Sequence, residues 1–167
     1  LLWLQGEYAR EIADNRFYEL AVHAFAKAGM DTNQFPLAYV KAALDTCKGK
    51  FKTFGELPSY AGFYFRDEVT YNAEAARKDF VPENKPRLQK LRDAFAKLDA
   101  FTAANLETTL KETAKDLGVK VGVMVHPTRL ALTGNTAGPS LYHLLEVLGK
   151  EKSLARIEQV LVKFRNE

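Results

Sequence analysis

Residues 122–149, GVMVHPTRLALTGNTAGPSLYHLLEVLG, form the stretch that decides the fold of this chain. It is an apolar segment interrupted by two proline-bearing turns. Proline at the first position of a helix loses only an amide that has no partner within the helix, so we expect Pro127 to begin a short helix that Gly134 ends. By the same rule, Pro139 is expected to begin a second helix and Gly149 to end it. The stretch therefore predicts two helix starts close together in the sequence.

The second of these expected helices has one apolar face, because its leucines recur at three- and four-residue steps. They are Leu141, Leu144, Leu145 and Leu148. Helix N-termini present unpaired amides and the positive end of the helix dipole, so two of them beside Arg129 could receive phosphates or base edges. Proline starts and glycine stops are also ordinary punctuation in a helical domain. The pattern alone leaves both interpretations open.

Length and composition are those of a globular domain. The chain has 167 residues, of which 47% are hydrophobic and 27% charged, and its formal net charge is +3. This charge permits a polyanionic partner without requiring one. No apolar run approaches the roughly 20 residues that a membrane-spanning helix needs. The single cysteine excludes an internal disulfide, and a start at Leu1 without an initiator methionine indicates a fragment.

In the first half, we expect one helix with Asp14 as its N-cap and Gly29 at its end. A helix after Pro36 carries Cys47 on its apolar face, so this thiol is expected to be buried and inert. Thr53 has capping-box spacing to Glu56, which predicts a further helix start that Pro58 strains.

Three lysines, Lys48, Lys50 and Lys52, surround Phe51. They either complete a helix end, where cations are favourable, or face a nucleic acid. The aromatic residues between 60 and 65 are interpreted first as core, with base stacking as the other possibility.

The second half shows only helical spacing. Pro86 is expected to begin a helix with many cations, which suits either an RNA backbone or solvent. Thr102 is expected to cap the next helix and Gly118 to end it. In the last helix Arg156 is expected to face outward. Since no segment alternates with period two for long, the predicted class is all-α.

Two segments in this half carry a family resemblance. They are 118–134, GVKVGVMVHPTRLALTG, and 138–156, GPSLYHLLEVLGKEKSLAR. They resemble the C-terminal anticodon-binding region of bacterial-type glutamyl-tRNA synthetases. That family carries a proline-x-arginine-x-alanine-leucine-threonine-glycine element, a proline-started helix, and then leucine-glycine-lysine-glutamate. Residues 1–10, LLWLQGEYAR, are similar to the segment that follows the catalytic region of that family.

The resemblance implies an all-α fold of two packed helical subdomains that form a cage for the anticodon. The loop composition between Pro82 and Pro86 predicts their boundary, which gives subdomains 1–83 and 84–167. It implies that the intact synthetase attaches glutamate to its tRNA with ATP and magnesium. The histidine-isoleucine-glycine-histidine and lysine-methionine-serine-lysine signatures of such enzymes are absent from this sequence. We therefore expect no catalytic residue, no metal and no cofactor in this chain.

The resemblance also assigns binding residues. Arg129 matches the family arginine that contacts the anticodon, and the turn matched by Pro139, Ser140 and Leu141 packs against a base. Thr133 belongs to the same conserved element of the family, and Lys48, Lys50 and Lys52 lie in the part facing the tRNA. The family often has threonine at position 138 and glycine at 140, where this chain has Gly138 and Ser140. These departures bear on whether glutamine tRNA is accepted beside glutamate tRNA.

The expected partner is therefore tRNA, bound by a monomer in the cytoplasm and without a membrane. The alternative function is a helical protein-interaction module that uses the aromatic cluster at 60–65 as its partner surface. Phosphate neutralisation makes RNA binding fall steeply with salt, so a salt titration separates the two functions.

Overall fold

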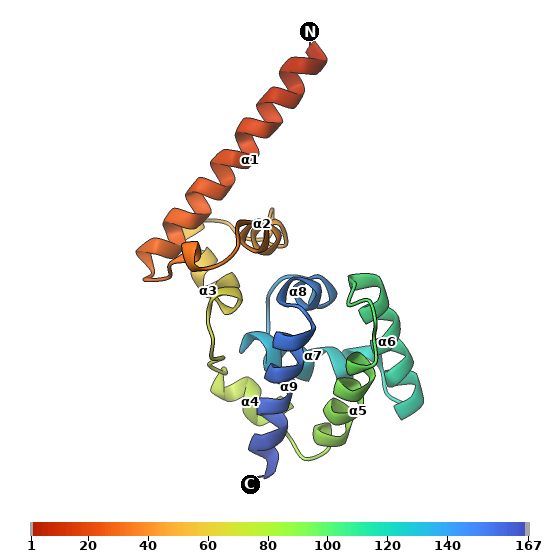
Figure 1. Cartoon of the computed structure of the whole chain (residues 1–167). Helices are drawn as coiled ribbons and strands as arrows, with labels where there is room; N and C mark the ends of the chain where they lie inside the picture. Colours follow the sequence, from red (N-terminus) through yellow and green to blue (C-terminus); the bar gives the residue numbers. More distant parts are fainter. Residues whose placement is uncertain (1, 166–167) are drawn as a thin grey trace. The chain divides into compact units, whose positions relative to one another are not determined.

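The computed structural model describes the backbone of residues 2–165 and the side chains of residues 15–163. Within this described part every regular element is an α-helix or a 3-10 helix, which confirms the all-α class. The chain divides into two compact units, Leu1–Phe65 and Arg66–Glu167. Figure 1 shows the helices of each unit along the chain.

The division falls at Phe65, earlier than the 83/84 boundary expected from loop composition. Residues 66–83 pack with the second unit because the Asn72 amide donates to the Gly134 carbonyl at 2.8 Å. The Asn72 side chain also accepts from the Ala75 amide at 2.9 Å and so begins helix α4 (Ala73–Asp79). No local pattern predicts a bond between segments so far apart in the chain.

The first unit contains α1 (Leu2–Lys27), α2 (Leu37–Asp45) and α3 (Leu57–Ala61), with 3-10 turns at Thr32–Gln34, Phe54–Glu56 and Gly62–Phe65. The expected N-cap at Asp14 is wrong, because α1 runs through this position without interruption. Its expected end is confirmed at Gly29, which has φ +83°. The Met30 amide bonds the Phe25 carbonyl at 2.9 Å and closes the helix.

Aromatic side chains form the core of this unit. Phe63, Tyr64 and Phe65 are all buried. The Phe65 ring lies 4.9 Å from that of Phe25, and the Tyr39 hydroxyl donates to the Tyr64 carbonyl at 2.6 Å. The core interpretation of residues 60–65 is confirmed for these three residues, so they do not offer the partner surface that the alternative function requires.

The second unit contains α4, α5 (Asn84–Ala96), α6 (Ala103–Leu117), α7 (Val121–Thr133), α8 (Leu141–Leu148) and α9 (Lys150–Arg165). Helix α7 packs against α4, α5, α6 and α9, and it lies in the middle of the unit in Figure 1. The Thr102 hydroxyl accepts from the Asn105 amide at 3.3 Å, and Gly118 ends α6 with φ +69°, both as expected. Helix α5 begins two residues before Pro86, which falls in its first turn.

The expectation that Arg156 faces outward is wrong. Its side chain is buried, with 3% of its surface exposed, and does not face outward. Nη1 donates to the Leu132 carbonyl at 2.7 Å and Nη2 to the Arg66 carbonyl at 2.8 Å. Leu132 lies in the last turn of α7, where carbonyls lack intrahelical partners and the helix dipole favours a cation. These acceptors make burial of the charge tolerable.

Candidate functional site

Helix α7 is continuous from Val121 to Thr133, with Pro127 inside it. The expected helix start at Pro127 is therefore wrong. An interior proline costs about 3 kcal/mol through the lost hydrogen bond and the ring clash. Here Pro127 lies on the buried face together with Met124 and Leu130, and burial of each large apolar side chain contributes about 1.5 to 3 kcal/mol. Packing of the whole face offsets the local penalty.

This correction changes the electrostatics of the connection between α7 and α8, residues 133–141, which we call the bend. The bend holds the carboxyl end of α7 and the amino end of α8, not two amino ends. Helix α8 begins after Ser140, later than the start expected at Pro139. Its leucine stripe and its end at Gly149, with φ +86°, are as expected. The twin-dipole anion site inferred from the sequence does not form.

Backbone and hydroxyl groups fix the α7 end of the bend. Gly134 has φ +80° and donates to the Leu130 carbonyl at 2.8 Å. The buried Thr133 hydroxyl lies 2.9 Å from the Arg129 carbonyl and accepts from the Asn135 amide at 3.0 Å. A Cβ atom at position 134 would lie 2.0 Å from the Thr70 carbonyl oxygen. Only glycine fits this crossing, which was predicted simply as a helix stop.

Arg129 joins α7 to the far side of the bend. Its Nη1 donates to the Pro139 carbonyl at 2.6 Å, and its side chain is half-buried. A Cβ atom at position 138 would lie 3.3 Å from Nη1, so Gly138 leaves room for the guanidinium. The arginine is thus positioned by a neutral carbonyl and keeps part of its surface exposed.

The structure brings four predicted residues together at the bend: Arg129, Thr133, Pro139 and Ser140. Leu141 is only 3% exposed, and its side chain belongs to the core of the unit. The Ser140 hydroxyl makes no capping bond to α8 and is half-exposed. Pro139 is buried as well, so of the predicted residues only Arg129 and Ser140 are accessible, next to the exposed residues 135–137.

The three predicted lysines lie in the first unit, on residues 46–54, which we call the lysine loop. The Lys48 ammonium lies 4.9 Å from the centre of the Tyr18 ring and 5.3 Å from that of Phe17. It also pairs with Asp45 at 3.2 Å, and Asp45 accepts from the Tyr18 hydroxyl at 2.6 Å. Tyr18 and Phe17 were not predicted as neighbours of this lysine. They belong to α1, about 30 residues earlier in the chain, and no local pattern links them to Lys48.

Lys50 and Lys52 are exposed on the same loop. Between them, Phe51 is half-exposed, and its ring lies 5.3 Å from that of Phe54. Cations beside partly exposed aromatic rings can neutralise phosphates and stack on bases. The expected capping box differs in detail, since Glu56 accepts from the Lys52 amide at 3.1 Å.

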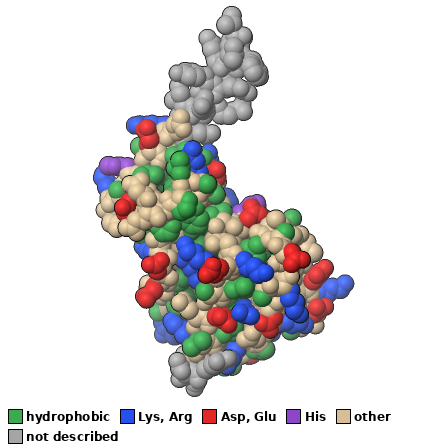
Figure 2. Space-filling view, viewed as in Figure 1, with side chains coloured by type: hydrophobic (Ala, Val, Ile, Leu, Met, Phe, Trp, Pro, Cys, Tyr) green, Lys and Arg blue, Asp and Glu red, His purple; other side chains and the backbone are tan. Residues whose placement is uncertain are grey.

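The visible surface of the second unit has mixed charge. On the face shown in Figure 2, Lys and Arg side chains alternate with Asp and Glu side chains. Among the described residues, no three His, Cys, Asp or Glu side chains come together to hold a metal ion. In the same part of the chain no helix combines the length and apolarity needed to cross a membrane.

The described part of the chain is thus a helical domain in which a partly exposed arginine is held at a bend. The family model of the anticodon binding domain matches residues 16–161. The chain belongs to this family.

Two relatives of this chain are named as glutamate–tRNA ligases. The chain is 32% identical over 164 residues to glutamate–tRNA ligase 2 of Caldicellulosiruptor saccharolyticus, covering 98% of this chain and 34% of the relative. It is 34% identical over 164 residues to glutamate–tRNA ligase of Geobacter sulfurreducens, covering 96% and 34%. The chain thus spans about a third of the length of these relatives. The resemblance to the anticodon-binding region of this synthetase family is confirmed.

A solved structure shares the fold. The crystal structure of a glutamate tRNA ligase from Elizabethkingia meningosepticum matches with a TM-score of 0.77 and 21% identity, over 96% of this chain and 31% of that one. The helical arrangement is therefore one that a solved glutamate tRNA ligase contains.

Proposed function

We propose that this chain binds the anticodon of a tRNA and is the C-terminal, anticodon-binding part of a glutamate–tRNA ligase. The observation that carries the proposal is Arg129, which the Pro139 carbonyl holds at the bend while part of the side chain stays exposed. Its relatives are named as ligases of glutamate and tRNA. In the intact protein the aminoacylation, with ATP and magnesium, belongs to a part that this chain does not contain.

Single-stranded RNA suits such a site. Unstacked loop bases expose their edges, which proteins read through hydrogen bonds and through arginine planes. Arginine pairs with two acceptors of guanine at once, and backbone groups at the bend can complete the pattern. Arg129 is the proposed base-reading residue. Ser140, which is half-exposed, and the exposed residues 135–137 of the bend form the surface beside it.

The lysine loop supplies a different kind of contact. Lys50 and Lys52 are exposed, and Lys48 is held by its ring and carboxylate neighbours. Such cations bind phosphates without reading sequence. We propose that these lysines add affinity for any tRNA, and that the bend adds preference for the anticodon.

Gly138 bears on which tRNA is preferred. A threonine at this position would bring its Cβ within 3.3 Å of Arg129 Nη1 and would shift the guanidinium. We propose that the glycine sets the position of the arginine for glutamate tRNA, with glutamine tRNA as the competitor to test. The proposed monomeric state and cytoplasmic location follow from the family alone.

The test compares two RNAs and two salt concentrations. Fluorescence anisotropy of the 167-residue chain would be measured with glutamate tRNA and with the same tRNA carrying an unrelated anticodon. We expect tighter binding of the first at every salt concentration and a steep loss of affinity for both as salt rises. Equal affinity for the two RNAs would contradict anticodon reading. Binding that does not respond to salt would contradict RNA binding altogether.

A further inference from the structure

A hollow in the Arg66–Glu167 unit lies apart from the predicted site residues. It has a volume of about 420 Å³, within the range of small-ligand sites. Its walls come from α4, from α9 and from the segments on either side of α4. The lining residues are Tyr71, Ala76, Arg77, Phe80, Val81, Pro82, Val160 and Lys163. No carboxylate is among them.

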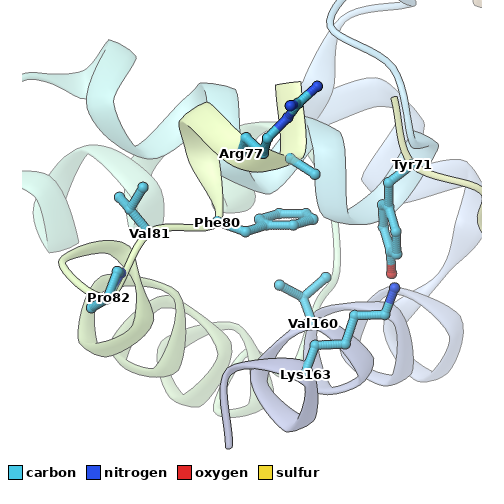
Figure 3. A pocket seen from close by; sticks show the side chains of 8 residues that line it. Tyr71, Arg77, Phe80, Val81, Pro82, Val160 and Lys163 are labelled. Carbon is cyan, nitrogen blue, oxygen red and sulfur yellow. The ribbon is translucent and has the colours of Figure 1, made fainter. Parts of the chain in front are cut away.

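Figure 3 shows how these side chains lie. Phe80 and Val160 face one another across the hollow, and Tyr71 stands at one side. The Tyr71 and Phe80 rings meet edge to face, with centres 5.2 Å apart. Both rings are half-exposed. The hollow therefore offers aromatic and aliphatic surface that another planar group can cover.

A lysine lies on the Tyr71 side of the hollow. The Lys163 ammonium lies 4.2 Å from the centre of the Tyr71 ring, and Lys163 is exposed. Arg77 contributes its stem to the wall, while Figure 3 shows its guanidinium directed away from Phe80. An apolar, aromatic hollow with cations and no acid at its wall fits a planar group that carries negative charge.

The hollow is connected to the bend by one short segment. Tyr71 precedes Asn72, whose amide donates to the Gly134 carbonyl at the end of α7 and whose side chain begins α4. The bend beside the proposed base-reading residue and helix α4, which Phe80 directly follows, are thus joined to each other within one unit.

We propose that this hollow binds one unstacked nucleotide of the same tRNA, with its base against Phe80 and its phosphate beside Lys163. Base stacking on an aromatic ring and phosphate pairing with a lysine are the usual contacts of single-stranded RNA sites. The proposal rests on the proposed function, because it takes the bound polymer to be tRNA.

The main test is a charge reversal with a matched control. Lys163 and Lys115 are both exposed and each is the third residue from the end of its helix, α9 and α6. Reversal has the same effect on the helix dipole at both places. We expect Lys163→Glu to weaken tRNA binding at least tenfold at low salt and Lys115→Glu to weaken it less than twofold. Equal effects of the two variants would overturn the proposal.

A second variant and a crosslink test the base contact. Phe80→Leu keeps apolar volume but removes the ring, and we expect about fivefold weaker binding or more. In wild type, tRNA carrying 4-thiouridine should crosslink to the peptide that contains Tyr71 and Phe80. Absence of that crosslink, in a sample that crosslinks elsewhere, would overturn the base assignment.

The two proposals fail separately. If wild type does not bind tRNA, the proposed function itself fails. If wild type binds and depends on Arg129 while Lys163→Glu matches Lys115→Glu, only the nucleotide in the hollow is wrong.

Discussion

The bend and the lysine loop both contain a left-handed glycine, yet the two glycines are surrounded differently. Gly134 in the bend has φ +80°, and its Cβ position is occupied by the Thr70 carbonyl. Gly49 in the loop has φ +74° and open space around its Cβ position. The turn of the bend is thus closed against a distant segment, whereas the turn at Gly49 has no neighbour at that position. A buried turn suits base reading, and exposed lysines suit phosphate contact.

The largest expected effect is the loss of stability when each of these two glycines is replaced by alanine. Gly134→Ala should lower the free energy of unfolding of its unit by about 2 to 6 kcal/mol, the sum of left-handed strain and overpacking. Gly49→Ala should lower it by about 1 to 2 kcal/mol, from strain alone. Urea denaturation followed by circular dichroism measures both. Similar losses would mean that the crossing at Thr70 relaxes easily.

Next in size is the loss of the base-reading arginine. We expect Arg129→Ala to weaken binding of glutamate tRNA by about 1 to 3 kcal/mol, the range for one base-specific contact. Helicity should stay unchanged, which circular dichroism checks. Arg129→Lys is the control that keeps the charge and loses the planar fork. If Arg129→Lys binds tRNA as tightly as wild type, Arg129 contributes only its charge. If either variant loses helicity, Arg129 has a structural role instead of base reading.

A smaller effect is expected at the lysine loop. Lys50→Ala or Lys52→Ala should weaken binding about fivefold at 0.15 M salt and lower the slope of log affinity against log salt by about one. The loss should be the same for tRNA with an unrelated anticodon, unlike the loss with Arg129→Ala. Anticodon-dependent loss would contradict the division of roles between loop and bend.

Cys47 provides the folding check for these lysine variants. Burial raises the pKa of its thiol to about 11, so little thiolate forms near pH 8. Alkylation at that pH should therefore remain slow in each variant as long as the first unit is folded.

The smallest effect is expected at Gly138. Gly138→Ala places a methyl group 3.3 Å from Arg129 Nη1, which requires a shift of a few tenths of an ångström. We expect nearly unchanged stability and a change below about threefold in affinity, equivalent to less than 1 kcal/mol. The ratio of affinities for glutamate and glutamine tRNA is the measurement that matters. An unchanged ratio would remove Gly138 from the specificity proposal.

Local signals in the sequence predicted much of the fold. The leucine stripe of α8 and the glycine ends of α1, α6, α7 and α8 depend on spacing and on backbone freedom within a few residues. The helix starts expected at Asp14 and Pro127 are wrong, because the preference of one residue for a helix end does not by itself end or begin a helix. The Pro127 position is buried along a whole face of α7, which one residue type does not reveal.

Long-range contacts account for the remaining differences. The burial of Arg156 depends on carbonyls at Leu132 and Arg66, and the unit boundary depends on the bond between Asn72 and Gly134. The residues gathered at the bend could be predicted from the family element, since they lie close together in sequence. The partners of Lys48 and the hollow beside Phe80 could not, because they join segments from distant parts of the chain.

The bond from Arg156 to the Arg66 carbonyl also bears on where the chain could be cut. The first residue of the second unit is tied to that unit's own last helix, so its opening segment is secured without help from the preceding sequence. A fragment begun at Arg66 would retain the buried guanidinium, both its acceptors and the glycine crossing. Cleavage just before Arg66 would therefore leave this clasp intact.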